Sequence, residues 1–439
     1  MGLRAFIELL QKNGELTKIT TSVSTEYELA GIINALNENP VYFDNVKESA
    51  VPVVAGLVSS KELICRALGT TKEQLLPKLS LAIDKPVKPE LVKDAVCQEV
   101  VYTGDAVDLT KLPIMSYTAK DGGKYIASAV SIVKDPQTGH QNMCFHRLML
   151  KDKNHFVARI VENRGTDNIL KKTGGELDIA ICVGNSTAVL LAAATSLPTG
   201  VDELGMANAL EKTAVVKCKT VDIEVPVDTE IVFEGKITNE KATEGPFLDL
   251  TGVVDRVRQQ PVIEINCVTQ RKNPIYQTIL AGKNEHKFLM GMPKEPTIYN
   301  EVNKVCQCKD IYITPGGCSW LHAVVQINKT HVDDGRKAIF AAFEGHKSLK
   351  HVVVVDEDIN IYNPHDVEWA ISTRFQADKN LVVLSNQSGS SLDPSGDLSE
   401  GKKATTAKAG VDATIPLITT GKGFKKEDYV KVDLNKYLM

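Results

Sequence analysis

Residues 126–150 read IASAVSIVKDPQTGHQNMCFHRLML, and this stretch decides the fold class of the central part of the chain. Two strand-like segments, Ile126–Lys134 and Asn142–Leu150, flank the turn-forming residues Asp135–Gly139. That arrangement predicts a β-hairpin. A third strand-like segment, His155–Val161, follows after a short polar link. The stretch therefore predicts short strands that are closely spaced along the chain.

Further strand-like segments continue toward the C-terminus, with one helix among them. The expected strands are Asp178–Val183, Val215–Val225, Ile231–Thr238, Gly252–Val257 and Ile263–Thr269, and the expected helix is Thr187–Thr195. Many short strands at this spacing are typical of a β-barrel.

The segments on either side of this region alternate helices with strands. Before it we expect a helix from Leu3 that stops at Asn13-Gly14, a helix Tyr27–Leu36, a strand Val51–Val58 and a helix Glu62–Leu68 that Ser59 or Ser60 can cap. After it we expect strands Ala323–Ile327, His351–Val355 and Leu381–Leu384, helices Asp334–Phe343 and Asp366–Thr373, and loops from Gln387 onward. The alternation predicts α/β domains, so we expect an α/β domain at 1–115, a barrel at 116–305 and an α/β domain at 306–439.

Composition excludes several classes of protein. The 439 residues carry a formal net charge of −4, which gives no general attraction to nucleic acid or to an anionic membrane. The first residues lack the apolar core of a signal peptide, and no apolar run is long enough to span a bilayer. Nine scattered cysteines fit reduced thiols. These features predict a cytoplasmic protein without a membrane span.

The segment Asn142–Arg147 carries the first candidate functional group. Side chains of a strand alternate between its faces, so Asn142, Cys144 and His146 are expected on one face and Arg147 on the other. An arginine on an apolar strand face is costly unless it pairs with an anion. A structural salt bridge explains Arg147 as well as a bound substrate does.

Two further segments carry charge next to glycine. In Glu244-Gly245-Pro246-Phe247-Leu248-Asp249 a tight loop has a carboxylate at each end, which suits acid–base catalysis, although acidic turns are also common without it. Arg159 and Arg164-Gly165 combine cations with a residue that lets the backbone approach a phosphate closely. A solvated basic turn is the alternative interpretation.

Together these segments resemble the UbiD family of decarboxylases, and the resemblance extends over nearly the whole chain. The matching stretches are Gln141–Arg147, Arg159–Gly165, Val215–Cys218, Glu224–Pro226, Glu230–Val232, Glu244–Asp249, Thr314–Ser319, Val353–Asp358, Trp369–Arg374 and Ala409–Thr414. The resemblance implies a mixed α/β fold: an N-terminal α/β domain, a central split β-barrel that holds a flavin, and a C-terminal α/β domain used in dimerisation.

The same resemblance implies the activity and the cofactors. Loss of CO2 from an unsaturated carbon needs an electron sink that side chains cannot provide, and the family uses prenylated FMN for this purpose. A flavin prenyltransferase must then supply the cofactor. A divalent metal, typically Mn2+ and often joined by K+, links the protein to the flavin phosphate. The chain is accordingly expected to be a homo-oligomeric carboxy-lyase that acts on a small unsaturated acid.

Site residues are assigned by resemblance, position by position. Arg147 matches the active-site arginine that orients the substrate carboxylate, while Glu244 and Asp249 match the two acidic residues, with Asp249 as the proton donor. Asn142 and Glu203 match metal ligands. The positions that match cofactor contacts are Phe145, His146, Arg147, Arg159, Ile160, Val161, Arg164, Gly165 and Lys408.

One position departs from the family pattern. Some members have a histidine metal ligand just before the Arg164-Gly165 position, and Asn163 stands there in this chain. An amide oxygen can still bind a hard cation. A non-catalytic flavin-binding subunit is the alternative of another class, and it predicts loss of Arg147 or of an acidic residue, all of which are present.

Substrate choice rests on chain length. The chain lacks most of the C-terminal extension of bacterial members that act on polyprenyl-hydroxybenzoate, and it resembles compact archaeal members. Those include decarboxylases that convert trans-anhydromevalonate 5-phosphate to isopentenyl phosphate in the archaeal mevalonate pathway. An aromatic acid such as a hydroxybenzoate is the alternative. A phosphorylated substrate needs a second cation besides Arg147, and Lys120 and Lys124 flank a glycine turn that could provide it.

Overall fold

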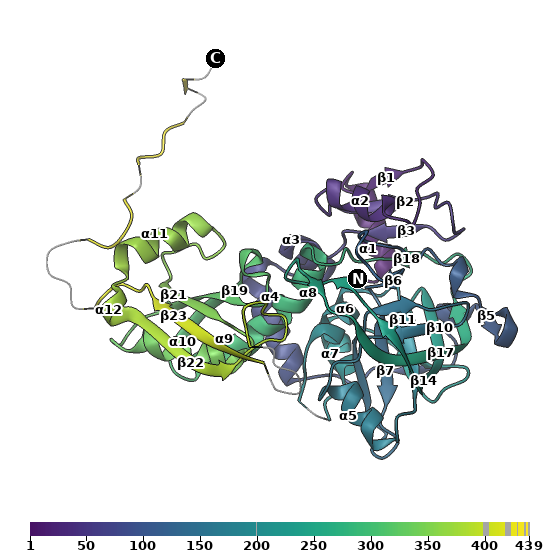
Figure 1. Ribbon diagram of the computed structural model, residues 1–439. Coiled ribbons are helices and arrows are strands. Elements are labelled where there is room, and N and C mark those ends of the chain that lie inside the picture. Colours follow the sequence, from purple (N-terminus) through teal and green to yellow (C-terminus); the bar gives the residue numbers. More distant parts are fainter. Residues whose placement is uncertain (199, 398–403, 418–422, 428, 434–435, 438–439) are drawn as a thin grey trace. The chain divides into compact units, whose positions relative to one another are not determined.

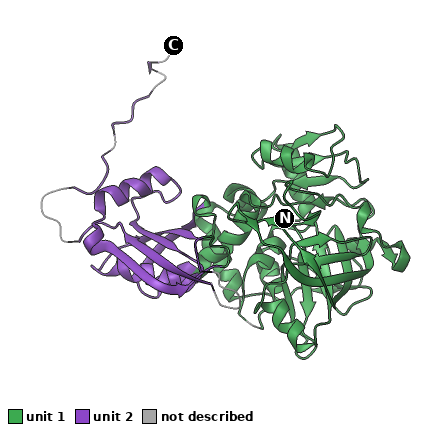
Figure 2. Cartoon of the chain, in the orientation of Figure 1, with its two compact units in different colours: residues 1–297, 315–320, 391–394 green, residues 298–314, 321–390, 395–439 purple. Residues whose placement is uncertain are grey.

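The computed structural model describes residues 1–198, 200–397, 404–417, 423–427, 429–433 and 436–437. These residues form two compact units, coloured separately in Figure 2. Unit 1 comprises residues 1–297, 315–320 and 391–394, and unit 2 comprises the remaining described residues. The domain boundaries expected near residues 115 and 305 stay predictions.

The N-terminal part of unit 1 is a small α/β assembly, as expected. Its helices are α1 (Leu3–Lys12), α2 (Glu28–Ala35), α3 (Lys61–Ala67) and α4 (Lys72–Asp84). Its sheet has the order β1-β2-β3-β18, built from Thr17–Ile19, Val41–Phe43, Val53–Ala55 and Tyr276–Gln277. Ser60 caps α3 because its hydroxyl accepts a hydrogen bond from the Leu63 amide at 3.2 Å. Strand β18 comes from far along the chain, after the central strands, so its pairing with β3 connects this sheet to the barrel region.

A nine-stranded sheet forms the centre of unit 1 (Figure 1). Its order is β6-β9-β10-β17-β14-β11-β7-β8, and β5 pairs with β17. The strands are β5 (Val100–Thr103), β6 (Tyr125–Ile126), β7 (Val130–Lys134), β8 (Gln141–Phe145), β9 (Leu148–Leu150), β10 (His155–Ala158), β11 (Leu177–Val183), β14 (Ile231–Glu244) and β17 (Arg258–Gln270). β7 and β8 pair antiparallel across the Asp135–Gly139 turn, which confirms the predicted hairpin.

The sheet must curl into a barrel because of its connections. β6 and β7 lie six places apart in the strand order, yet only residues 127–129 join them. A flat sheet would separate the two strands by about 29 Å at about 4.8 Å per strand. Three linking residues reach across at most about 14 Å. Since β8 and β9 are related in the same way, both short links hold the two ends of the order near each other, and the predicted split barrel is confirmed.

Two predicted strands of this region are each divided in the structure. The segment Asn142–Leu150 is interrupted at His146 and Arg147, because β8 pairs with β7 while β9 pairs with β6 and β10. The segment Val215–Val225 folds back on itself as β12 (Val215–Lys217) and β13 (Glu224–Pro226). Short strands β4 (Leu91–Val92), β15 (Phe247–Leu248) and β16 (Val254–Asp255) complete unit 1.

Helices cover the barrel and carry part of its hydrophobic core. They are α5 (Gly165–Lys172), α6 (Thr187–Ala194), α7 (Glu203–Leu210) and α8 (Asn284–Gly291), followed by the 3-10 turn η4 (Met292–Lys294). The next helix, α9 (Glu295–Asn303), runs from unit 1 into unit 2. Almost all of α6 is buried, which agrees with its apolar sequence. The predicted helix Thr187–Thr195 is thereby confirmed to within one residue.

Unit 2 contains a five-stranded sheet of order β19-β20-β21-β23-β22. The strands are Gln307–Ile313, His322–Asn328, His351–Asp356, Thr405–Asp412 and Leu381–Ser388, in that order, and the helices are α10 (Asp334–Gly345), α11 (Pro364–Arg374) and α12 (Ala377–Asn380). The expectation of loops throughout the tail from Gln387 is wrong, since β23 lies between two other strands. Gly410 permits this position, because a Cβ there would lie 2.2 Å from Ile339 of α10.

Within the described residues, no helix is long and apolar enough to cross a membrane. This agrees with the expected absence of a membrane span. The cytoplasmic location stays a prediction.

Candidate active site

Arg147 lies where the chain passes from one end of the barrel sheet to the other. β8 ends at Phe145 and β9 begins at Leu148, so Arg147 has no place in either ladder. Its backbone is nevertheless fixed, because its carbonyl accepts a hydrogen bond from the Arg159 amide at 3.1 Å. The break in the strand therefore turns this side chain out of the regular alternation and into a cluster of carboxylates.

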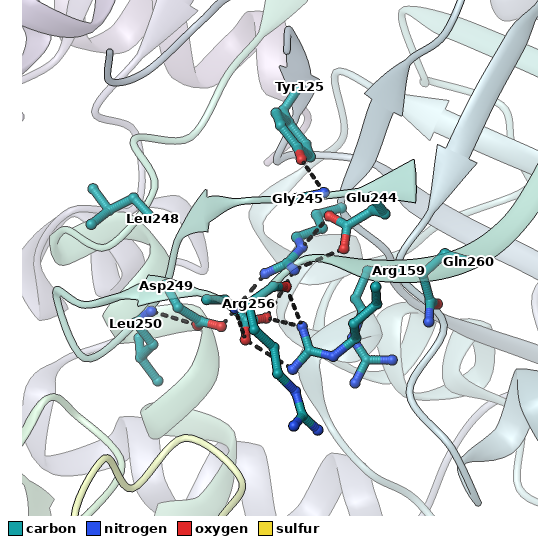
Figure 3. Close-up of polar contacts among 12 residues, drawn as sticks. Tyr125, Arg159, Glu244, Gly245, Leu248, Asp249, Leu250, Arg256 and Gln260 are labelled. Carbon is teal, nitrogen blue, oxygen red and sulfur yellow. Dashed lines mark hydrogen bonds and ion pairs between the residues drawn. The ribbon is translucent and has the colours of Figure 1, made fainter. Parts of the chain in front are cut away.

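Three carboxylates, those of Glu244, Asp249 and Asp255, pair with the Arg147 guanidinium. Figure 3 shows Glu244 and Asp249 on the loop that joins them. Its Nε and Nη2 donate to Glu244 at 2.8 and 3.0 Å, in a bidentate pair. Its Nη2 also donates to Asp255 at 2.9 Å, and its Nη1 lies 3.5 Å from Asp249. Burial opposes the charge, but the hydrogen bonds and charge of Glu244 outweigh it and hold the pKa of Arg147 above its ordinary value. The predicted association of Arg147 with Glu244 and Asp249 is present in the geometry.

The loop that carries the two acids is packed against a second glycine turn. Gly245 has a φ of 92° and its amide donates to the Tyr125 hydroxyl at 3.0 Å. Gly122 approaches so closely that a Cβ on it would lie 2.2 Å from the Gly245 carbonyl oxygen, while its amide donates to Pro246 at 2.8 Å. These two contacts require glycine at position 122 and fix the loop between Glu244 and Asp249.

The two acids differ in their surroundings. The side chain of Glu244 is fully buried, whereas that of Asp249 is 16% exposed. Asp249 accepts a hydrogen bond at Oδ1 from the Leu250 amide at 2.6 Å, which leaves Oδ2 toward Arg147. Asp249 is therefore the acid of this pair that a substrate can reach.

Three residues of this cluster are absent from the sequence-based assignment. Asp255 bridges Arg147 to Arg258, whose Nη1 lies 2.7 Å from Asp255. Burial raises the pKa of Asp255, but the hydrogen bonds from Arg258 and the charge of Arg147 have the larger, opposite effect. The pKa of Asp255 therefore lies below its ordinary value. His286 of α8 accepts a hydrogen bond at Nδ1 from the Gly282 amide at 3.0 Å. No local sequence signal marks these residues, because each becomes relevant only through a distant contact.

His286 lies close enough to the acid cluster to interact with its charges. Burial lowers its pKa, and the charge of Asp249 opposes this while that of Arg147 adds to it. The backbone around Gly282 contacts the acid loop directly, because a Cβ there would lie 2.9 Å from the Asp249 carbonyl oxygen. With Nδ1 occupied as an acceptor, a neutral His286 carries its proton on Nε2.

The face opposite Arg147 contains the residues expected to bind metal and flavin. Asn142, Cys144 and His146 are in mutual contact, with Nδ2–Sγ at 3.7 Å and Sγ–Nε2 at 3.4 Å. The predicted shared face of these three residues is thus confirmed. Burial lowers the pKa of His146 to about 4, so this imidazole is neutral. Gly165, at the start of α5, meets the Asn142 amide so closely that a Cβ would lie 2.0 Å from its Oδ1.

Glu203 lies beside this face. Its Oε2 accepts a hydrogen bond from the Met143 amide at 2.9 Å, which places the carboxylate next to β8. Burial raises the pKa of Glu203 to about 8, and the backbone hydrogen bonds from Met143 and from Glu203 itself only partly offset that rise. The Glu203 carboxylate and the Asn142 amide oxygen are donors of the kind that suits a hard cation. Among the residues described, no three His, Cys, Asp or Glu side chains form a metal cluster by themselves, so other ligands would have to complete a site.

The remaining predicted cofactor contacts lie in two places. Arg159 donates to the Ile160 carbonyl at 2.6 Å and pairs with Glu162 at 3.2 Å, and Val161 is exposed. Asn163, with a φ of 60°, accepts from Lys171 at 3.2 Å. Lys408 belongs to unit 2, where its Nζ donates to the Lys347 carbonyl at 2.6 Å and burial lowers its pKa to about 8. Its role in the site stays a prediction.

Comparison with known families accounts for most of the chain. The 3-octaprenyl-4-hydroxybenzoate carboxy-lyase N-terminal domain matches residues 7–83, the Rift-related domain of the same family matches 90–284, and its C-terminal domain matches 287–413. The chain belongs to the UbiD family. The resemblance inferred from the sequence is thereby confirmed, together with the carboxy-lyase class.

Similar UbiD proteins include archaeal enzymes of matching length. An anhydromevalonate phosphate decarboxylase of Methanosarcina mazei is 44% identical, over 95% of this chain and 97% of that protein. The enzyme of the same name from Methanocaldococcus jannaschii is 40% identical, over 93% and 96% of the two chains. The UbiD-class enzyme HmfF from Pelotomaculum thermopropionicum, solved in complex with FMN, is 36% identical with a TM-score of 0.94 and covers 100% of both chains.

Proposed function

We propose that this UbiD protein decarboxylates trans-anhydromevalonate 5-phosphate to isopentenyl phosphate with prenylated FMN as cofactor. Relatives of the same length that carry this activity in their names support the substrate, and neighbours solved with FMN or with prFMN support the flavin. The observation that carries the proposal is the position of Arg147, which contacts both a fully buried Glu244 and a reachable Asp249.

Each of the three residues has a distinct part in the proposed reaction. Arg147 orients the substrate carboxylate, and its bidentate pair with Glu244 fixes the guanidinium plane. When bound, prenylated FMN supplies the electron sink for loss of CO2. Asp249 then donates a proton at Oδ2 to the carbon that has lost its carboxylate. Asp255 holds the second edge of Arg147, so it positions the arginine without contacting the substrate.

Residues of β8 and of the segments that follow it would hold the cofactor. Asn142 and Glu203 would provide oxygen ligands for a divalent ion, with Mn2+ as the proposed metal and K+ as its proposed companion. Phe145, His146 and the Arg159–Val161 segment would contact the flavin. Arg164 and Gly165 at the start of α5 suit its phosphate, since the amides of a helix N-terminus attract anions. Lys408 is the proposed further phosphate contact, and Asn163 takes no part, because its side chain is engaged by Lys171.

Further parts of the proposal concern partners. A flavin prenyltransferase would supply the cofactor, and the chain would work as a homodimer or larger homo-oligomer in the cytoplasm. A dimeric form of HmfF has been solved in complex with prFMN.

A product assay tests the proposed function. The protein is prepared with and without a co-expressed flavin prenyltransferase and offered trans-anhydromevalonate 5-phosphate, its dephosphorylated analogue or 3,4-dihydroxybenzoate. We expect isopentenyl phosphate from the first compound, only with the co-expressed preparation. Full activity of protein that carries ordinary FMN by mass spectrometry would refute the cofactor assignment.

An aromatic acid is the second candidate substrate. A 3,4-dihydroxybenzoic acid decarboxylase from Enterobacter cloacae shares the fold with a TM-score of 0.89 at 25% identity. Preferential turnover of the dihydroxybenzoate in the assay above would favour this candidate. A non-catalytic subunit is disfavoured, since Arg147, Glu244 and Asp249 are all present and in contact, and absence of turnover with every acid would support it.

Replacement of Glu203 by glutamine tests the metal site. Because burial keeps the free Glu203 carboxyl close to neutrality at pH 7, glutamine should preserve the fold and the bond from Met143. We expect the affinity of the protein for the metal to fall by at least about tenfold. The amount of bound flavin should fall with it. Elemental analysis and flavin absorbance measure both.

Asp202→Asn is the matched control, because Asp202 is the adjacent carboxylate and caps α7 through the Leu204 amide at 2.9 Å. Asparagine is also a good cap, so metal content should stay unchanged in this variant. Equal metal per chain in Glu203→Gln and the original protein would contradict the assignment.

A further inference from the structure

Lys294 is a cation of unit 1 for which the described residues provide no acidic partner. It ends η4, directly after the buried residues Met292 and Pro293, and Met292 belongs to the core that α6 and α8 share. Its Nζ donates to the Ser196 hydroxyl at 2.9 Å. Among the residues that the structure describes, no carboxylate forms an ion pair with Lys294. The backbone of this lysine is therefore held firmly while its charge is not neutralised.

A second cation lies near Lys294. Burial, together with the charge of Arg164, lowers the pKa of Lys294 to about 8. Arg164 is exposed at the start of α5 and likewise has no acidic partner in the described part of the chain. The charge of Arg164 disfavours the charged form of Lys294, and an anion bound beside Lys294 relieves that repulsion.

The position of Lys294 along the chain relates it to the acid cluster. His286 lies within α8 and Lys294 ends η4. The rise per residue of these two elements places the two residues about 13 Å apart along the helix axes. His286 interacts electrostatically with Asp249 and Arg147. That separation suits a ligand with an anionic group at each end. The substrate of the proposed function has this form, with a carboxylate at one end and a phosphate at the other.

We propose that Lys294 binds the phosphate monoester of the substrate and so determines specificity for a phosphorylated acid. This inference rests on the proposed function. The flavin phosphate is the other possible source of the same chemical group. Its proposed partners already include the metal at Asn142 and Glu203, the start of α5 and Lys408, so Lys294 is left for the substrate. Of the earlier candidates, Lys120 is exposed and Lys124 donates to the Thr25 hydroxyl at 3.1 Å.

Substitution of Lys294 distinguishes these sources. Lys294→Met keeps the length of the side chain and removes the charge, while Lys294→Arg retains the charge. We expect Lys294→Met to lower kcat/KM for trans-anhydromevalonate 5-phosphate by about 10- to 100-fold, the effect of one charge-assisted hydrogen bond. The value for the dephosphorylated analogue should change by less than about twofold, and Lys294→Arg should restore most of the activity. Lys304→Met, on an exposed lysine paired with Glu301, is the matched control.

A binding measurement separates this inference from the proposed function. Calorimetry with FMN-loaded protein and isopentenyl phosphate needs no turnover, and Lys294→Met should weaken binding by about the same factor. Loss of flavin from Lys294→Met would instead assign the lysine to the cofactor phosphate and overturn the inference. Equal losses for the phosphorylated and dephosphorylated acids would also overturn it. If the unmodified enzyme turns over neither acid yet binds isopentenyl phosphate through Lys294, the proposed reaction fails while the phosphate site stands.

Discussion

Replacement of Asp249 by asparagine is expected to lower decarboxylation by about 100- to 10,000-fold, the usual contribution of a positioned general acid. Asparagine preserves the shape of the side chain and can still accept the hydrogen bond from the Leu250 amide, which Asp249 accepts at 2.6 Å. It cannot donate a proton of comparable acidity. Flavin and metal content should therefore stay unchanged while kcat falls. The rate at which deuterium from D2O enters the product measures the same proton transfer and should fall in parallel with kcat.

Asp255→Asn is the matched control for this variant. Asp255 also contacts Arg147, but it pairs with Arg258 and holds a lowered pKa, so it is unsuited to donate a proton. The substitution removes a carboxylate from the same arginine and should affect kcat much less than Asp249→Asn. Near-normal turnover by Asp249→Asn would move the proton donor to Glu244 or to water.

Replacement of Arg147 by methionine should abolish detectable decarboxylation and also lower the free energy of unfolding by about 3–5 kcal/mol, because a buried ion pair loses one partner. Glu244 is fully buried and receives two hydrogen bonds from Arg147, at 2.8 and 3.0 Å. Methionine fills similar space but leaves that carboxylate without its counter-charge. Urea unfolding measures the loss of stability, and the product assay measures the loss of activity.

Two further variants separate the structural part of this effect from the catalytic part. Adding Glu244→Gln to Arg147→Met removes the unpaired charge, so stability should partly return while activity does not. Arg4 forms a comparable bidentate pair with buried Glu230, at 2.8 and 2.7 Å. Arg4→Met should lower stability and leave kcat unchanged. Recovery of activity in the double variant would show that Arg147 has only a structural role.

Much of the fold is legible in the sequence because local patterns determine it. The turn at Asp135–Gly139 predicted the β7–β8 hairpin, and the apolar run at Thr187–Ala194 predicted a buried helix. The two-residue period of strand side chains placed Asn142, Cys144 and His146 together, and their contacts agree. These are all relations between residues that lie close together along the chain.

The site is partly legible for a different reason. The segments around Arg147 and Glu244–Asp249 resemble a family in which those residues act together, so they could be associated without knowledge of any distance. That route gives only residues that the family motif contains. Asp255, His286 and Lys294 lie outside it, and no period, turn or spacing distinguishes them from other charged residues of the chain.

The sequence by itself determined the local elements, the family and the acidic and basic groups that the family shares. Only the tertiary structure decided which strands are neighbours, and with that it decided the partners of Arg147. The pairing of β14 with β17 sets Glu244 opposite Arg258, across register shifts at Glu234/Gly235 and Ile237/Lys241. No local pattern specifies such a register, because it depends on contacts between segments far apart in sequence and on how the closed sheet buries one face. The interruption of the strand at Arg147 has the same origin, since it exists only because β8 and β9 pair at opposite ends of the curled sheet.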